Sequence, residues 1–204
     1  MKKIDPKKSA LIVQDLQNDV ITEGGAFAES GAPAHATKQK VVANVKKLAA
    51  AAREKGIPVI HVWYVVDKGA PGLKQNAPLF QAVRATNGVV RGTWGAAPVK
   101  GLEAKRGDFV VEKMRMCAFT DTTLETILKG CGTERLVITG AWTNFSIEHT
   151  ARTGADLGYE VTVISDGTST INDEWQNAAL SYALTNIAEV GTTAEALKAL
   201  GAKK

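Results

Sequence analysis

Short apolar runs alternate with helical patterns along nearly the whole chain, and this alternation constrains the fold more than any other feature. Runs rich in β-branched residues predict strands at residues 9–15, 59–66, 108–112, 136–139, 159–164 and 187–190. Helical patterns predict helices at residues 34–55, 79–85, 121–128, 145–157, 174–186 and 193–200. Such alternation is typical of βαβ units with right-handed crossovers. We therefore expect a single α/β domain over residues 1–204, with three α/β/α layers and a mostly parallel sheet of roughly six strands.

The composition and charge exclude several classes of protein. Hydrophobic residues make up 45% and charged residues 23% of the chain, as in ordinary globular domains rather than disordered or collagen-like chains. Much of the net charge of +4 comes from lysines at the two ends, including Lys2, Lys3, Lys203 and Lys204. No basic stripe carries interleaved aromatic residues, and no segment reaches the roughly 18 uninterrupted apolar residues of a membrane helix. Neither nucleic acid nor a membrane is an expected partner.

The cysteine content indicates where the protein works. Cys117 and Cys131 are the only cysteines, and two cysteines do not make a disulfide framework. The apolar run at residues 10–13 is too short for the core of a signal peptide. Reduced cysteines are typical of intracellular proteins, so we expect a cytoplasmic location.

Three polar residues stand where predicted strands end or the following helix begins. Asp15 closes the first strand, Lys113 follows the strand at residues 108–112, and Ser146 begins the helix after residues 136–139. The carboxyl ends of parallel strands share one edge of the sheet, and ligands bind there. Each residue alone has an ordinary interpretation, because a strand-end Asp caps, a Lys is solvated and a helix-start Ser is an N-cap. Their coincidence at three strand ends favours a functional site.

The longest irregular stretch lies at residues 67–107, which contain three prolines and many glycines. A loop of this length inside a compact domain is usually functional, often as a lid or the wall of a cavity. We expect it to set specificity, and its Gln75, Arg84 and Arg91 are candidates for binding a carboxylate.

Three segments resemble the isochorismatase-like cysteine hydrolases, a family that includes nicotinamidases, N-carbamoylsarcosine amidohydrolases and ureido amidases. They read SALIVQDLQND from residue 9, VVEKMRMCAFTDTTLETIL from residue 110 and LVITGAWTNFSIEHTARTGADLGYEVTVISDGT from residue 136. GTWGA at residues 92–96 is similar to a segment of the ureido-amidase branch. The resemblance extends from about residue 9 to about residue 195 and implies hydrolysis of a C–N bond in a small amide or ureido substrate.

The resemblance also implies a catalytic set of Asp, Lys and Cys, and one member differs here. Asp15 matches the general acid/base and Lys113 its electrostatic partner, but the nucleophile position falls on Ser146. A thiol ionises near pH 8.5, or lower beside a cation, whereas a serine hydroxyl is far more basic. Because the surrounding motif is intact, we expect a Cys→Ser variant at position 146 of an amidohydrolase, inactive or slow in this form.

The serine at this position is compatible with three alternatives. Ser146 is consistent with a natural, active serine nucleophile. The isochorismatase branch, which hydrolyses a vinyl ether, needs no nucleophile and would use Asp15 as the acid. A catalytically silent homologue that only binds a ligand is the third alternative. The GTWGA segment favours the amidase over the vinyl-ether hydrolase.

The resemblance implies further features around the reaction. It implies a cis peptide bond between Ala141 and Trp142, and an oxyanion hole formed by the N–H groups of Trp142 and Ser146. Such donors stabilise charge that develops in the transition state. The candidate substrate-binding residues are Trp142, Phe119, Asn18 and Trp175.

We expect no metal or other cofactor. Nicotinamidases carry an Asp-x-His…His cluster after the second strand, where this chain reads WYVVDKGAPG. His35, His61 and His149 lack the spacing of metal ligands, and we expect His61 to pack in the core. The expected partners are a small-molecule substrate and, because family members are commonly dimers or tetramers, one or three further copies of the chain.

Overall fold

A parallel sheet of six strands organises the protein, in a computed structural model that describes residues 1–202. The strands are β1 (Ser9–Gln14), β2 (Val59–Tyr64), β3 (Phe109–Lys113), β4 (Arg135–Ala141), β5 (Glu160–Ser169) and β6 (Glu189–Gly191). Their spatial order is β3-β2-β1-β4-β5-β6, and every neighbouring pair is parallel. The predicted α/β fold is confirmed, while Lys203 and Lys204 lie outside the described residues.

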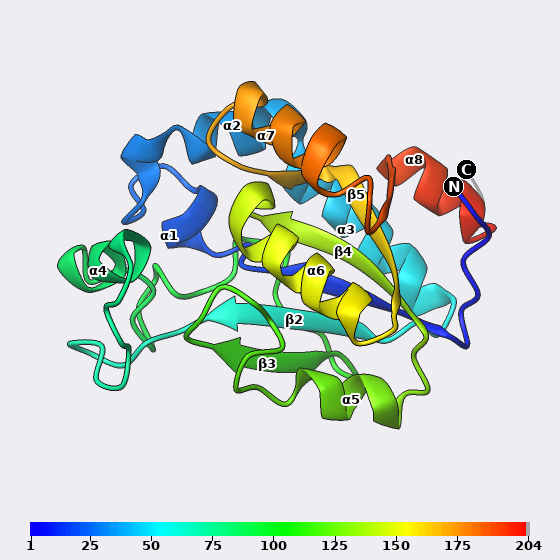
Figure 1. Cartoon of the computed structure of the whole chain (residues 1–204), viewed down its shortest axis with the longest axis horizontal. Coiled ribbons are helices and arrows are strands. Elements are labelled where there is room, and N and C mark those ends of the chain that lie inside the picture. Colours follow the sequence, from blue (N-terminus) through cyan, green and yellow to red (C-terminus); the bar gives the residue numbers. More distant parts are fainter. Residues whose placement is uncertain (203–204) are drawn as a thin grey trace.

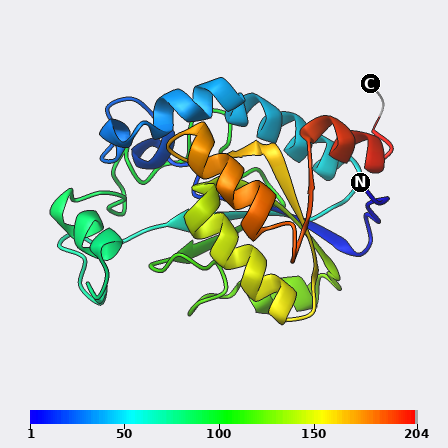
Figure 2. The ribbon, with the colours of Figure 1, turned by 45° about the horizontal axis from the view of Figure 1, so that its top comes forward.

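Helices cover both faces of this sheet, which gives the predicted three layers (Figures 1 and 2). They are α1 (Asn18–Ile21), α2 (Ala32–Gln39), α3 (Val41–Glu54), α4 (Pro78–Ala85), α5 (Leu124–Gly130), α6 (Glu148–Asp156), α7 (Asp173–Ala178) and α8 (Thr193–Ala199). Figure 2 shows α2, α3 and α8 along one face, and α6 and α7 on the opposite side. Within residues 1–202, no helix is long and apolar enough to cross a bilayer.

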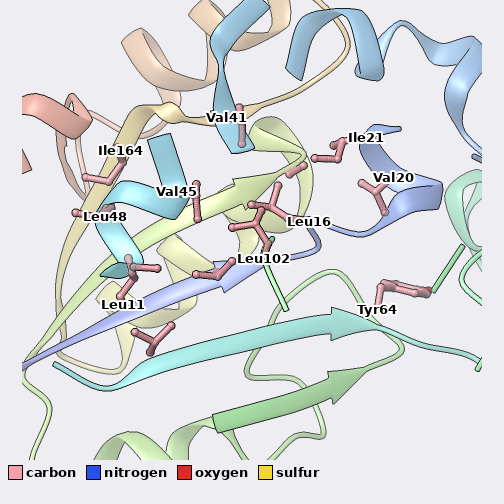
Figure 3. Packing of buried hydrophobic residues seen from close by; sticks show 14 of the residues in the cluster. Leu11, Leu16, Val20, Ile21, Val41, Val45, Leu48, Tyr64, Leu102 and Ile164 are labelled. Carbon is pink, nitrogen blue, oxygen red and sulfur yellow. The ribbon is translucent and has the colours of Figure 1, made fainter. Parts of the chain in front are cut away.

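The core follows from the alternation of side chains along the strands. All six residues of β1 are buried, because the strand lies in the middle of the sheet with helices on both sides. Leu11 packs with Val45 and Leu48 of α3 in the cluster shown in Figure 3. Ile12 points to the other face and joins a second cluster with α5 and α6.

Several element boundaries differ from the sequence prediction for local reasons. The helix expected at residues 34–55 is two helices, because Lys40 adopts a left-handed conformation with φ 56° and its N–H caps the end of α2. The helix expected from residue 145 begins earlier, with a π-helical turn, η2 (Thr143–Ile147). β5 runs to Ser169 rather than ending at residue 164, since a register shift lets it pair with the end of β4.

The long loop lies beyond the carboxyl ends of the strands, where Figure 1 shows α4 standing apart from the sheet. Two isolated bridges hold this loop, one between Val66 and Val90 and one between Gln17 and Pro98. The N-terminus and α8 lie at the opposite end of the molecule (Figure 1). The loop therefore covers the edge of the sheet where Asp15, Lys113 and the turn η2 emerge.

Gly140 allows β4 to approach β1 at this edge, and replacing it tests the contact. Its φ is 135°, and a Cβ at this position would overlap the carbonyl oxygen of Gln14. We expect Gly140→Ala to lower the free energy of unfolding by more than about 2 kcal/mol in urea denaturation. Gly130→Ala is the matched control, because its Cβ meets no atom within 4 Å and it ends a helix. Equal stabilities of the two variants would contradict this role of Gly140.

Candidate active site

The structure brings Asp15, Lys113 and Ser146 together at the carboxyl edge of the sheet. The Nζ atom of Lys113 lies 2.8 Å from Oδ2 of Asp15 and donates a hydrogen bond of 3.4 Å to Oγ of Ser146. All three side chains are buried. The result is a carboxylate, an amine and a hydroxyl in mutual contact, as the three strand ends predict.

The sheet itself places Asp15 and Lys113. Asp15 directly follows β1, and its N–H donates to the carbonyl oxygen of Val62 in β2. Its φ of 54° turns the chain away from the sheet, in a conformation that Asp tolerates better than most residues. Lys113 ends β3 on the other side of β2, in register with Tyr64. The two side chains thus approach each other across the end of β2.

Ser146 comes from the far side of β1. It lies in the turn η2, which leads from β4 into α6. The Nε2 atom of Gln14, the last residue of β1, donates to the carbonyl oxygens of Ser146 and Met116, at 3.2 and 3.3 Å. One buried amide therefore ties the serine turn and the segment after β3 to the end of β1.

Burial decides the electrostatics of this group. It raises the pKa of Asp15 above its usual value, against the opposing influence of Lys113. It lowers the pKa of Lys113, against the opposing influence of Asp15. Both shifts favour a proton held on the carboxyl group and a neutral amine, so the energies of the charged and neutral pairs are brought closer together. Such a pair is suited to accept and return a proton during a reaction.

The backbone before Ser146 has the shape that the family resemblance implies. The peptide bond between Ala141 and Trp142 is cis, which confirms that prediction. The N–H of Trp142 donates to no acceptor among residues 1–202, while the carbonyl oxygen of Trp142 accepts from the N–H of Phe145. A backbone donor without a protein partner thus lies next to the serine turn.

A cavity opens above Asp15 and Ser146, with an empty volume of about 450 Å³ including its mouth. Trp142 lines it, as predicted. The long loop contributes Leu79, Val83 and Val89, so it forms one wall of the cavity.

Three predicted substrate-binding residues do not line this cavity. Asn18 turns away, and its Nδ2 donates to the carbonyl oxygen of Trp94 at 2.8 Å. Phe119 stacks on Tyr159 at a centroid distance of 6.1 Å, and Trp175 packs edge-on against Phe145 at 6.0 Å. Membership of a motif placed these residues near the site in sequence, but it did not fix the direction of their side chains.

Sequence reasoning missed the residues that hold the loop over the site. The side chain of Gln17 bonds both backbone polar groups of Tyr64 and the carbonyl oxygen of Ala96. The carboxylate of Asp19 accepts hydrogen bonds from the N–H groups of Ala26 and Val89. Both residues follow the strand-end Asp15 in the motif QDLQND, which was the available signal.

The GTWGA segment has a structural explanation in these contacts. The N–H of Asp19 donates to the carbonyl oxygen of Gly95, and a Cβ on Gly95 would overlap the Asp19 carboxylate. The amide of Asn18 holds the neighbouring Trp94 carbonyl. This segment therefore docks on the residues after β1 and closes the loop onto the sheet edge.

The histidines and cysteines lie elsewhere. Within residues 1–202, no cluster of three or more His, Cys, Asp or Glu side chains is placed to hold a metal ion. His61 is buried in β2, as predicted, and its Nε2 lies 3.1 Å from Asp108. Cys117 is buried against Thr153, with 3.3 Å between Sγ and Oγ1.

A double-mutant cycle tests the coupling of Asp15 and Lys113. Asp15→Asn and Lys113→Met each leave a buried partner without its counterpart, so each is expected to lower the unfolding free energy by about 3 kcal/mol or more. The double variant removes both groups, and its loss is expected to be smaller than the sum by at least about 1 kcal/mol. Urea denaturation measures all four proteins. Additive losses would show that the two side chains are not energetically coupled.

Comparison with known proteins agrees with this architecture. The model of the Isochorismatase domain matches residues 9–195. The ureidoacrylate amidohydrolase RutB from Enterobacter sp. (strain 638) is 35% identical over 209 residues, covering 93% of this chain and 88% of that protein.

Solved structures share the fold at lower sequence identity. A cysteine hydrolase from Pseudomonas syringae pv. phaseolicola 1448A superposes with a TM-score of 0.87 at 24% identity, covering 98% of this chain and 96% of the other. The N-carbamoylsarcosine amidase from Thermoplasma acidophilum gives a TM-score of 0.71 at 23% identity, covering 91% and 96%. The family model spans the whole sheet and all three converging residues, and the chain therefore belongs to the isochorismatase domain family.

Proposed function

We propose that the protein is an amidohydrolase that cleaves a C–N bond in a small amide or ureido substrate. The observation that carries this proposal is the contact of Asp15, Lys113 and position 146 beneath one cavity. A relative 35% identical over most of both chains is a ureidoacrylate amidohydrolase, which supports the same class of reaction.

The proposed reaction proceeds through an acyl-enzyme. The Asp15 carboxylate accepts the proton of the nucleophile at position 146, which attacks the amide carbon. The N–H groups of Trp142 and Ser146 stabilise the resulting oxyanion. When the tetrahedral intermediate collapses, the C–N bond breaks and Asp15 returns its proton to the leaving nitrogen.

Water then completes the cycle. It attacks the ester, or the thioester where position 146 is Cys, and Asp15 again accepts and returns one proton. The products are an acid and an amine or ammonia. In the charged state of the pair, the Lys113 ammonium holds Asp15 in place at 2.8 Å and favours its ionised form.

Ser146 is a poor nucleophile for this mechanism. A serine hydroxyl needs a strong base, and a carboxylate is a far weaker base than the alkoxide that forms. We infer that the site is organised for a thiolate and that the chain with Ser146 turns over slowly or not at all. Two properties favour thiolate formation: Lys113, when it carries its positive charge in the ion-paired state, and the first turn of a helical segment.

Vinyl-ether hydrolysis is the second candidate, and one observation favours it. The raised pKa of Asp15 suits a group that donates a proton to carbon, and that reaction requires no nucleophile at position 146. A ligand-binding homologue without turnover is the remaining alternative. Substitutions at position 146 separate all three.

Restoring a thiol tests the amidase proposal. We expect Ser146→Cys to raise ammonia release from small primary amides and N-carbamoyl compounds by at least about 100-fold, because the thiolate forms more readily than the alkoxide. Ser165→Cys is the matched control, since Ser165 lies outside the cavity. Equal or lower activity of Ser146→Cys would identify Ser as the native nucleophile.

Ser146→Ala distinguishes the remaining mechanisms. An acyl-enzyme route from either Ser or Cys loses turnover in this variant, whereas vinyl-ether hydrolysis retains it. Loss of isochorismate, followed beside ammonia release, reports the second reaction. A ligand-binding homologue shows turnover in none of the variants.

We also propose a cytoplasmic location and a homodimer or homotetramer. Free, unpaired Cys117 and Cys131 support a reducing compartment. Phe109 and Val110 are 38% and 42% exposed on the edge strand β3, which supports contact with another copy. Light scattering of the purified chain gives the number of subunits directly, and a monomer would contradict the proposed assembly.

A further inference from the structure

The walls of the cavity above Asp15 and Ser146 are almost entirely hydrocarbon. The apolar lining residues come from four separate segments and are Val20, Phe27, Leu79, Val83, Val89, Met116, Ala141, Trp142 and Phe145. The indole N–H of Trp142 is used internally, because it donates to the carbonyl oxygen of Val20 at 3.2 Å. The polar side chains that line the cavity are Asp15, Tyr64 and Ser146.

These polar groups gather at the base. Tyr64 ends β2, and its ring lies 4.8 Å from the Nζ atom of Lys113. Figure 3 shows Tyr64 at the carboxyl end of β2, on the side of Val20 and away from Leu11 and Leu48. Its hydroxyl is buried without a hydrogen-bond partner in residues 1–202, as is Oδ1 of Asp15. Both atoms can therefore form a hydrogen bond with a polar group of a substrate at the base of the cavity.

No arginine or histidine among residues 1–202 lines the cavity. The guanidinium of Arg115 lies over the ring of Phe80 at 3.6 Å and donates to Asn76 and to the carbonyl oxygen of Lys74. It therefore holds the loop rather than facing the cavity.

The loop residues considered as carboxylate ligands do not reach the cavity either. Arg91 pairs with Asp67 and Glu112, and Arg84 is exposed. Gln75 does not line the cavity. The Lys113 amine is already in contact with Asp15, so a substrate carboxylate in the upper cavity would be buried without a cation, which is strongly unfavourable.

The aromatic wall favours a hydrocarbon group instead. Phe27 meets Trp142 edge-on at 6.3 Å, and Trp142 lies 5.9 Å from Phe145. Aliphatic side chains of α4 and of the loop after it line the cavity as well, together with Val20, Met116 and Ala141. The close approach of these aromatic and aliphatic side chains limits the substituent to a compact one.

We propose that the substrate is an uncharged carboxamide whose acyl group carries a compact hydrocarbon substituent. The amide end lies at the base, near Tyr64, and the hydrocarbon lies against the aromatic wall. This inference rests on the proposed amidohydrolase function of the same site. It separates the protein from its relative named for ureidoacrylate, whose substrate name denotes a carboxylate.

A matched pair of substrates tests the inference in the Ser146→Cys variant. Butanamide and succinamate have the same chain length and differ in a terminal methyl group against a carboxylate. We expect kcat/KM for butanamide to exceed that for succinamate by at least about 30-fold. A preference for succinamate, or equal rates, would overturn the inference while leaving the amidohydrolase proposal intact.

Introducing a positive charge into the cavity wall provides a second test. Leu79 is half-buried on α4, so Leu79→Arg places a cation at the cavity without disturbing the core. We expect it to shift the ratio of the two rates toward succinamate by on the order of tenfold. Ala85→Arg adds the same charge at an exposed position of the same helix and is expected to leave the ratio unchanged. An equal shift in both variants would overturn the inference.

Binding to the chain with Ser146 keeps the two proposals separable. Saturation-transfer NMR with butanamide and succinamate measures which ligand contacts the protein, without any turnover. If no amide is hydrolysed by Ser146→Cys but butanamide alone binds, the amidohydrolase proposal fails and the selectivity of the cavity stands. If neither molecule binds nor reacts but N-carbamoyl compounds are hydrolysed by Ser146→Cys, the inference fails and the amidohydrolase proposal stands.

Discussion

The contact between Asp15 and Lys113 is the interaction on which the rest of the site depends. A carboxylate and an amine 2.8 Å apart, both removed from water, are costly to bury compared with hydrocarbon of the same volume. Their presence is therefore poorly explained by stability. The pair fits the proposed acid/base role, because burial shifts the two pKa values in directions that bring its charged and neutral forms closer in energy.

The parallel sheet brings Asp15 and Lys113 into contact and also fixes the distance between them. Asp15 and Lys113 belong to strands on either side of β2, so their separation is fixed by the spacing of strands rather than by a flexible loop. The amide of Gln14 fixes the third partner, since it holds the backbone of Ser146 to the end of β1. The sheet and its backbone contacts thus fix the positions of all three side chains, as the proposed catalysis requires.

The sequence was informative where function depends on strand ends and uninformative where it depends on loop paths. Asp15 and Lys113 were predictable because buried strands are easy to recognise and parallel strands end at one edge. The break at Lys40 was not, because Lys favours helices and its left-handed backbone carries no compositional sign. Phe119 and Trp175 do not line the cavity, since a motif fixes the position of a residue along the chain but not the direction of its side chain.

For the long loop, the sequence predicted the role but not the path of the chain. Its length predicted a cavity wall, and α4 with the residues after it forms one. Its path is set by two side chains after β1, Gln17 and Asp19, that bind its backbone far away in the sequence. Contacts of this kind, between a side chain and a distant peptide group, leave no periodic pattern that sequence reasoning can detect.

The hydrocarbon wall and the buried ion pair are two parts of one physical arrangement. An apolar cavity keeps water away from Asp15, and this exclusion is the cause of its raised pKa. A polar or charged wall would admit water and return the carboxyl group toward its ordinary acidity. A substrate that completes the apolar enclosure keeps water away from Asp15, whereas a substrate carboxylate in the same enclosure would be buried without a cation. Selectivity for an uncharged substrate and the reactivity of the acid/base pair follow from the same low-dielectric surroundings.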